Sequence, residues 1–141
     1  MFFAYRGFTA DPDRMLQEHG YGRAHHRALH FIHRAPGTTV NNLLDILGVT
    51  KQSLNRVLRT LVEDGLVDAR VGDRDRRERH LHLTVAGETL NRDLSEVQGE
   101  RLNAAFAIAG EDAVTGFKTV LEAMMDPDLR RRFIEVAEGR K

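Results

Sequence analysis

The chain has 141 residues, no cysteine, and balanced charge, with 21 Lys and Arg against 21 Asp and Glu. This length is enough for one domain whose core needs no disulfide or metal, and the lack of cysteine excludes thiolate zinc sites and cysteine nucleophiles. A net charge of zero argues against a protein that coats nucleic acid without selectivity, because such proteins need a large basic excess.

The first part of the chain, residues 1–36, is expected to form N-terminal helices that act as scaffold and dimerisation elements. Its start is apolar and aromatic but resembles neither a signal peptide nor a membrane span, so a cytoplasmic protein without a membrane partner is expected. The sequence Asp-Pro-Asp at 11–13 has the composition of a helix start, which predicts a short helix from there to Gly20. Apolar residues at helical spacing predict a second helix over 23–34.

Residues 37–84 carry the signals of a helix-turn-helix followed by a hairpin. Thr39 and Thr50 are suited to cap two helices, and Gly48 permits the sharp turn between them. After Gly65, residues 66–71 and 80–84 alternate apolar and polar side chains, which predicts two antiparallel strands. The tip between these strands, residues 72–79, holds four arginines (Arg74, Arg76, Arg77 and Arg79), so it is solvated or lies against a polyanion.

Residues 85–141 return to helical periodicity and are expected to form C-terminal dimerisation helices. A break at Gly110 separates two of them, and Asp-Pro-Asp at 126–128 predicts the start of a last one. The predicted fold is therefore mostly α with a small two- or three-stranded β wing, in one domain spanning 1–141. This is the layout of a winged helix-turn-helix with helices at both ends.

The second helix of this module has the side chains needed to read DNA. Gln52, Asn55 and Arg56 can match base edges in a major groove, whereas Lys51 and Arg59 suit phosphate contacts. Arginines at the hairpin tip suit a minor groove, where the negative potential is enhanced. Two plainer interpretations stay open: a solvated amphipathic helix, and a tip whose arginines pair with its own acids Asp73, Asp75 and Glu78.

The segment GVTKQSLNRVLRTLVEDGLV at 48–67, followed by Asp-Arg-Arg at 75–77 and Leu-Thr at 83–84, resembles the recognition helix and wing of the MarR family of transcriptional regulators. The resemblance implies a homodimer on a pseudo-palindromic operator, acting as a repressor that is released when a small, often aromatic or anionic, effector binds between the dimerisation helices and the DNA module. It also implies that Asp75 steadies the wing while Arg76 or Arg77 enters the minor groove. The predicted DNA contacts are Thr39, Thr50, Lys51, Gln52, Ser53, Asn55, Arg56, Arg59, Arg74, Arg76 and Arg77.

Effector contacts are predicted at four ring-bearing residues, Tyr5, His26, His30 and Phe31, with aromatic core packing as the alternative. Histidines also crowd the 23–34 helix, where His26, His30 and His33 have the spacing of helical metal ligands. No carboxylate shares that helix and three arginines do, so no metal or other cofactor is predicted, and a metal-sensing regulator stays an alternative.

The sequence also bears on two other classes of function, an enzyme and a protein-binding module. An enzyme is not expected, because the sequence has no glycine-rich phosphate loop, no GxSxG motif and no cysteine. A winged helix that binds protein instead of DNA is the other alternative. It would tend to show apolar or aromatic residues at the wing, and there are none between Gly72 and His80.

Overall fold

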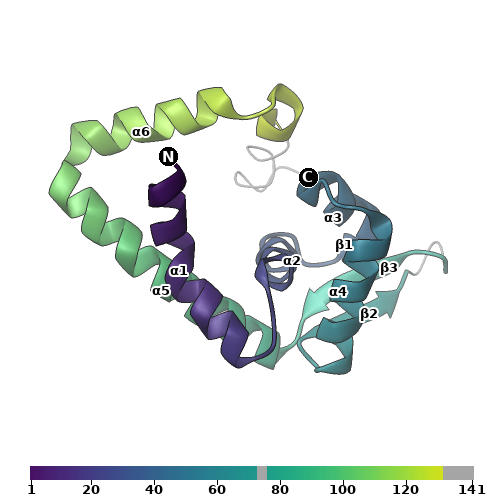
Figure 1. Cartoon of the computed structure of the whole chain (residues 1–141). Coiled ribbons are helices and arrows are strands. Elements are labelled where there is room, and N and C mark those ends of the chain that lie inside the picture. Colours follow the sequence, from purple (N-terminus) through teal and green to yellow (C-terminus); the bar gives the residue numbers. More distant parts are fainter. Residues whose placement is uncertain (73–75, 132–141) are drawn as a thin grey trace. The chain divides into compact units, whose positions relative to one another are not determined.

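The structure is a computed structural model that describes residues 1–72 and 76–131, so the wing predictions for Arg74 and Asp75 lie outside the described residues. It confirms a mostly helical fold with a small antiparallel sheet (Figure 1). The elements are α1 (Phe2–Glu18), α2 (Arg23–Arg34), β1 (Thr38–Thr39), α3 (Val40–Leu47), α4 (Lys51–Glu63), β2 (Val67–Val71), β3 (Arg79–Leu83), α5 (Val85–Ala109) and α6 (Glu111–Met124). The chain divides into two compact units, Met1–Gln98 and the part from Gly99 onward, and α5 contributes to both.

The first helix differs from the prediction, because α1 runs without interruption from Phe2 to Glu18 and encloses Pro12. A proline inside a helix lacks one backbone hydrogen bond and crowds the preceding turn. Here the Pro12 ring is fully buried, on the same helical face as Thr9 and Leu16. This burial offsets the local penalty, so the helix start predicted at residues 11–13 was wrong.

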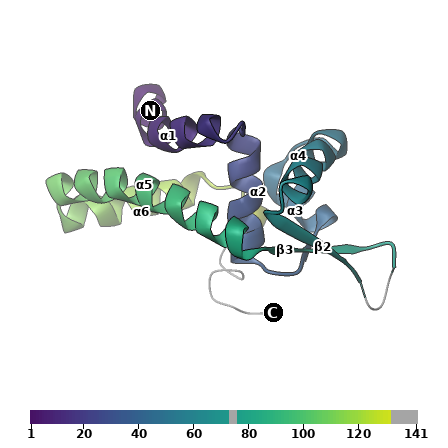
Figure 2. The same cartoon turned by 90° about the horizontal axis from the view of Figure 1, so that it is seen from below.

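Helix α2 is the central helix of the first unit, lying between α1 and α4 in both views (Figures 1 and 2). Its residues Ala28, Leu29 and Ile32 have no exposed surface. Their spacing along the sequence puts them on one face of the helix. They pack in one core with Leu16 of α1 and Leu61 of α4. The core therefore holds the scaffold helices and the helix-turn-helix in a single body.

The helix-turn-helix forms as predicted. The hydroxyl oxygens of Thr39 and Thr50 accept hydrogen bonds from the backbone N–H groups of Asn42 and Ser53, each at 3.2 Å, so both threonines cap their helices. Gly48 between the helices has φ +61°, a left-handed conformation that other residues rarely adopt.

The wing is part of a three-stranded sheet with the order β1-β3-β2. Strand β2 pairs with β3 in antiparallel register from Val67 opposite Leu83 to Val71 opposite Arg79. The short β1 adds a third strand at Thr38 and Thr39, and β2 and β3 extend away from the helices (Figure 2). The wing is thus anchored at its base to the segment that caps α3.

Thr84 joins the end of the wing to the start of α5. Its hydroxyl donates to the Gly65 carbonyl at 2.6 Å and accepts from the Gly87 N–H at 3.1 Å, while its own N–H donates to the Leu66 carbonyl at 3.0 Å. Gly87 is buried against Leu66. This contact leaves no room for a side chain at Gly87.

The second unit contains α6, none of whose described residues is buried. An edge-to-face contact joins Phe106 of α5 to Phe117 of α6, with ring centroids 6.2 Å apart. A further helical turn begins after Asp126, whose carboxylate accepts from the Asp128 N–H at 2.9 Å. Among the described residues, no helix is long and apolar enough to cross a membrane.

Candidate nucleic-acid interface

The exposed face of α4 carries a continuous row of long polar side chains: Lys51, Gln52, Asn55, Arg56 and Arg59. The opposite face buries Leu54, Val57, Leu58 and Leu61 in the core, so the helical period leaves the polar row facing outward. These five side chains line a shallow depression of about 520 Å³.

None of these five side chains forms a hydrogen bond or ion pair with another part of the described chain. Surface arginines and lysines often pair with neighbouring acids. On this helix three cationic groups and two amides stay unengaged instead. Their donors and acceptors are therefore available to base edges and phosphates.

The N-terminal end of α4 brings Thr50 and Ser53 next to this row. The Thr50 oxygen is used by the cap, but its hydroxyl proton is still able to donate. A helix N-terminus also favours an anion through its free N–H groups and its dipole. Thr39 caps the N-terminal end of α3 in the same way, so both predicted threonines are suited to phosphate contacts.

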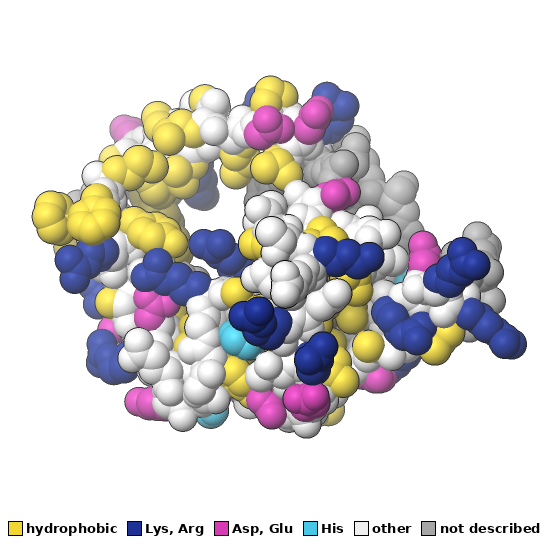
Figure 3. Space-filling view, turned by 45° about the vertical axis from the view of Figure 1, so that its right-hand side comes forward, with side chains coloured by type: hydrophobic (Ala, Val, Ile, Leu, Met, Phe, Trp, Pro, Cys, Tyr) yellow, Lys and Arg dark blue, Asp and Glu magenta, His cyan; other side chains and the backbone are white. Residues whose placement is uncertain are grey.

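The described part of the wing tip is also exposed. Arg76 and Arg77 are solvent-accessible, and Lys and Arg side chains gather over the β2–β3 end of the molecule (Figure 3). The Arg79 guanidinium donates to the backbone carbonyls of Arg76 at 3.0 Å and Glu78 at 3.3 Å. Arg79 thus stabilises the turn, a role that no sequence pattern indicated.

A cavity of about 240 Å³ lies between α1 and α2 and brings together all four residues predicted to contact an effector. The complete lining is Tyr5, Phe8, Thr9, Pro12, Asp13, Arg23, His26, Arg27, His30, Phe31 and Gln98. Tyr5 joins residues of α2 here because α1 is a single helix that passes over α2. Five of these residues carry aromatic or imidazole rings, and the sequence pattern indicated all of them except Phe8. The charged residues Asp13, Arg23 and Arg27 were not predicted.

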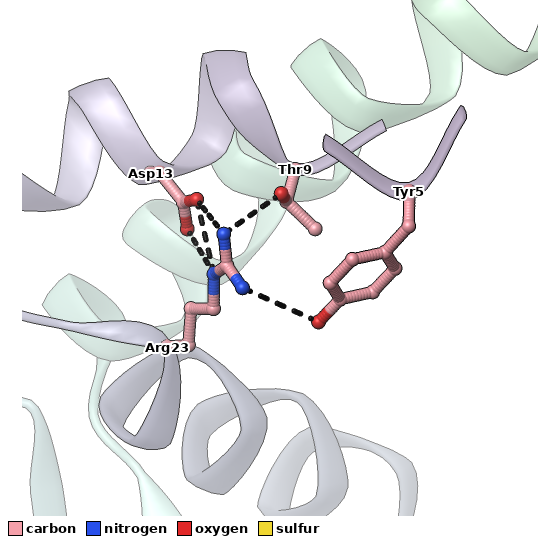
Figure 4. Close-up of polar contacts among 4 residues, drawn as sticks. All are labelled: Tyr5, Thr9, Asp13 and Arg23. Atoms are coloured by element: carbon pink, nitrogen blue, oxygen red, sulfur yellow. Dashed lines mark hydrogen bonds and ion pairs between the residues drawn. The ribbon is translucent and has the colours of Figure 1, made fainter. Parts of the chain in front are cut away.

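On one wall of the cavity, Arg23 of α2 contacts three residues of α1 (Figure 4). Its guanidinium donates from Nε and Nη2 to Asp13, the shortest distance being 2.6 Å, and from Nη2 to Thr9 Oγ1 at 3.0 Å. Nη1 reaches the Tyr5 hydroxyl at 3.5 Å. The hydrogen bond from Arg23 is the main reason that the pKa of Asp13 lies below its usual value. These hydrogen bonds stabilise the contact between α1 and α2.

Two histidines of α2, His26 and His30, have pKa values below the ordinary value of histidine. Burial is the largest cause that lowers the pKa of both His26 and His30, and nearby positive groups lower these pKa values further, His30 acting on His26 and Arg34 on His30. His33 instead pairs with Glu88 at 2.7 Å, and His25 Nδ1 accepts the Gly22 N–H at 3.1 Å. Within residues 1–72 and 76–131, no three His, Asp or Glu residues are grouped so that they could hold a metal ion.

The architecture and the exposed α4 face define the chain as a winged helix-turn-helix protein. The profile of the MarR family matches residues 19–78. The HTH-type transcriptional regulator PetP of Rhodobacter capsulatus is 68% identical over 133 residues, which cover 94% of this chain and 80% of the relative. The chain therefore belongs to the MarR family of transcriptional regulators, as the sequence motifs predicted, and is not an enzyme.

Solved structures agree with this assignment. The crystal structure of MarR is 25% identical, with a TM-score of 0.75, and the match covers 93% of this chain and 87% of MarR. The MepR–DNA complex of S. aureus shares the fold at 20% identity and a TM-score of 0.72, with 86% of this chain and 90% of MepR covered. The winged helix-turn-helix fold seen here is thus the fold of these proteins.

Proposed function

We propose that the protein binds a pseudo-palindromic operator as a homodimer, represses transcription, and is released from DNA by a small aromatic anion. The observation that carries the DNA-binding part is the row of unengaged polar side chains on α4. Each subunit inserts α4 into a major groove, and the two helices of a dimer lie about 34 Å apart, one turn of DNA. In this arrangement Gln52, Asn55 and Arg56 read bases, while Lys51 and Arg59 hold phosphates.

Binding to duplexes selected from random DNA tests this division of roles. Gln52→Ala and Asn55→Ala are expected to relax base preference at particular positions, by about 1–3 kcal/mol for a lost bidentate contact. Arg59→Ala is expected to weaken binding to all sequences and to reduce the salt slope by about one. Arg92→Ala on α5, whose side chain pairs with Asp93 at 3.3 Å, is the matched control. A uniform loss for Gln52→Ala would reassign that residue to phosphate.

The wing is proposed to contact the flanking minor groove. Arg76 and Arg77 are both exposed there, and the family resemblance supports the same role for Arg74, with Asp75 steadying the tip. The Arg76→Ala/Arg77→Ala double variant is expected to weaken binding broadly and to lower its salt dependence. Unchanged affinity would refute a wing contact.

Dimerisation is supported by the apolar side chains that the single chain leaves in water. Phe2 is 65% exposed, Ile108 89%, and α6 has exposed Phe117, Val120 and Met124. Patches of this kind mark interaction surfaces, and an obligate dimer would cover them. Sedimentation equilibrium of the full chain tests this part: a monomer at micromolar concentration would contradict it.

The cavity between α1 and α2 has the chemistry of a site for an aromatic anion. Phe8, Phe31 and Tyr5 offer apolar ring faces. Arg27 on the same wall makes no hydrogen bond or ion pair within the described chain, unlike Arg23, which Asp13 neutralises. An effector carboxylate therefore finds one uncompensated cation beside the rings.

Release from DNA then requires that the effector bind a conformation with lower operator affinity, because a ligand shifts an equilibrium only by its difference in affinity between states. The test is operator affinity in the presence of benzoate and substituted benzoates. Arg27→Gln is expected to lose most of the response while keeping wild-type operator affinity without the ligand. An undiminished response in Arg27→Gln would move the anion site elsewhere.

A further inference from the structure

Helices α1 and α4 end in the same way, although they are far apart in the sequence. At the end of α1, Gly20 has φ +75° and its N–H donates to the Gln17 carbonyl at 3.0 Å, while the Tyr21 N–H donates to the Leu16 carbonyl at 2.9 Å. This pair of bonds is a Schellman motif, which fixes the backbone just beyond a helix.

At the end of α4, Gly65 has φ +70° and its N–H donates to the Val62 carbonyl at 3.1 Å. The Leu66 N–H donates to the Leu61 carbonyl at 2.8 Å, completing a second Schellman motif. Asp64 is the residue that caps this helix. Both helix ends are therefore held by backbone hydrogen bonds, and a bond between them joins two defined positions.

One side-chain hydrogen bond makes this connection. The Tyr21 hydroxyl donates to the Asp64 carboxylate at 2.7 Å, across 43 positions of the sequence. The Tyr21 ring lies against His25, with centroids 5.1 Å apart, and is stacked on His19 at 6.2 Å. These ring contacts restrict the tyrosine side chain, so its hydroxyl is directed at the C-terminal end of α4.

Tyr21 also lies in the short segment that connects α1 to α2, the two helices that line the cavity. The segment 19–22 is the only covalent link between α1 and α2, and Gly22 is the residue before α2 begins. Across the cavity, the Arg23–Asp13 ion pair joins the same two helices at 2.6 Å. A change in the spacing of α1 and α2 must therefore be absorbed by the segment that carries Tyr21.

From this geometry we propose that Tyr21 and Asp64 are positioning residues that transmit the spacing of α1 and α2 to the C-terminal end of the recognition helix. Neither side chain belongs to the row on α4 that faces DNA. The inference rests on the proposed DNA-binding role of α4 and on the cavity as the place where α1 and α2 respond. In this proposal, the hydrogen bond between Tyr21 and Asp64 couples the cavity to α4.

The first test asks whether the hydrogen bond affects DNA binding. Asp64→Asn and Asp64→Ala remove the same charge, but only asparagine keeps an oxygen that can accept from Tyr21. A net hydrogen bond of this kind corresponds to about threefold to tenfold in affinity. Asp64→Ala is therefore expected to bind a selected duplex about threefold to tenfold more weakly than Asp64→Asn. In a Tyr21→Phe background the two variants should bind equally.

The second test asks whether the bond transmits the spacing of the cavity helices. Asp13→Asn weakens the Arg23 contact and is expected to change operator affinity about threefold in the wild-type background. In Tyr21→Phe the same substitution should have no effect within about twofold, since coupled residues are not additive. Arg14→Gln, which breaks an ion pair with Asp11 inside α1 at 2.7 Å, is the control and should leave affinity unchanged.

A purely structural role is separated by amide hydrogen exchange. Tyr21→Phe is expected to speed exchange at Gly65 and Leu66 while the melting temperature stays within a few degrees. Additive effects of Asp13→Asn and Tyr21→Phe, equal binding by Asp64→Asn and Asp64→Ala, or an Asp13→Asn variant with wild-type affinity would each overturn the inference. A wild-type protein that selects no duplex would instead refute the proposed function.

Discussion

Replacing Gly87 with alanine tests the packing that holds α5 against the turn after α4. A Cβ atom at this position would lie 2.1 Å from the Leu66 carbonyl oxygen and 3.0 Å from its carbon. Both neighbours are backbone atoms, so no side-chain rotation relieves the overlap. The turn after α4 or the start of α5 must move.

The expected cost follows from three contributions. Alanine in place of glycine favours a helix by about 0.5–1 kcal/mol. Overpacking costs about 1–3 kcal/mol, and the displaced Leu66 carbonyl also weakens its 3.0 Å hydrogen bond from the Thr84 N–H, worth about 0.5–1.5 kcal/mol. The net effect on the free energy of unfolding is a loss of about 0.5–4 kcal/mol, or about 2–16 °C in melting temperature.

Urea and thermal unfolding measure this loss directly, and the same helix supplies the control. Nothing lies within 4 Å of a Cβ at Gly99, so Gly99→Ala is expected to raise stability by about 0.5–1 kcal/mol. Operator affinity of Gly87→Ala should fall as well, because the strained turn follows α4. Equal stability of the two variants would refute the packing argument.

Three other predictions concern the cap, the histidines and the wing junction. Thr50→Ala is expected to lower the free energy of unfolding by about 1 kcal/mol, whereas Thr50→Asn keeps a capping oxygen and most of the stability in the same urea titration. The pKa values of His26 and His30 are lowered from 6.5 on folding, so the unfolded chain binds protons first. Stability should therefore be highest above pH 6.5 and fall as the pH is lowered below it, and His26→Gln/His30→Gln should flatten that dependence; an unchanged pH profile would show that these groups are not responsible. Thr84→Val removes the hydroxyl that links Gly65 to Gly87, and it is expected to cost about 1–2 kcal/mol; a loss no larger than that of Thr89→Val, whose hydroxyl bonds only within α5, would contradict the proposed link.

Much of the fold followed from the sequence because its signals are local. Thr39, Gly48 and Thr50 specify capping and turning within a few residues of themselves, and the structure places each in that role. The outward row on α4 follows from the helical period, which puts Gln52, Asn55 and Arg59 opposite the buried leucines. The alternation of apolar and polar residues likewise predicted β2 and β3, because successive side chains of a strand point to opposite faces.

The tertiary structure alone decided the features that depend on contacts between distant segments. Pro12 has the local signature of a helix start, but its burial in the core keeps α1 continuous. That continuous helix brings Tyr5 over α2 and so assembles the cavity, and it places Asp13 beside Arg23. The contact of Tyr21 with Asp64 spans 43 positions and has no sequence period to mark it. Periodicity and capping are properties of neighbouring residues, whereas burial and long-range pairing exist only once the chain has packed.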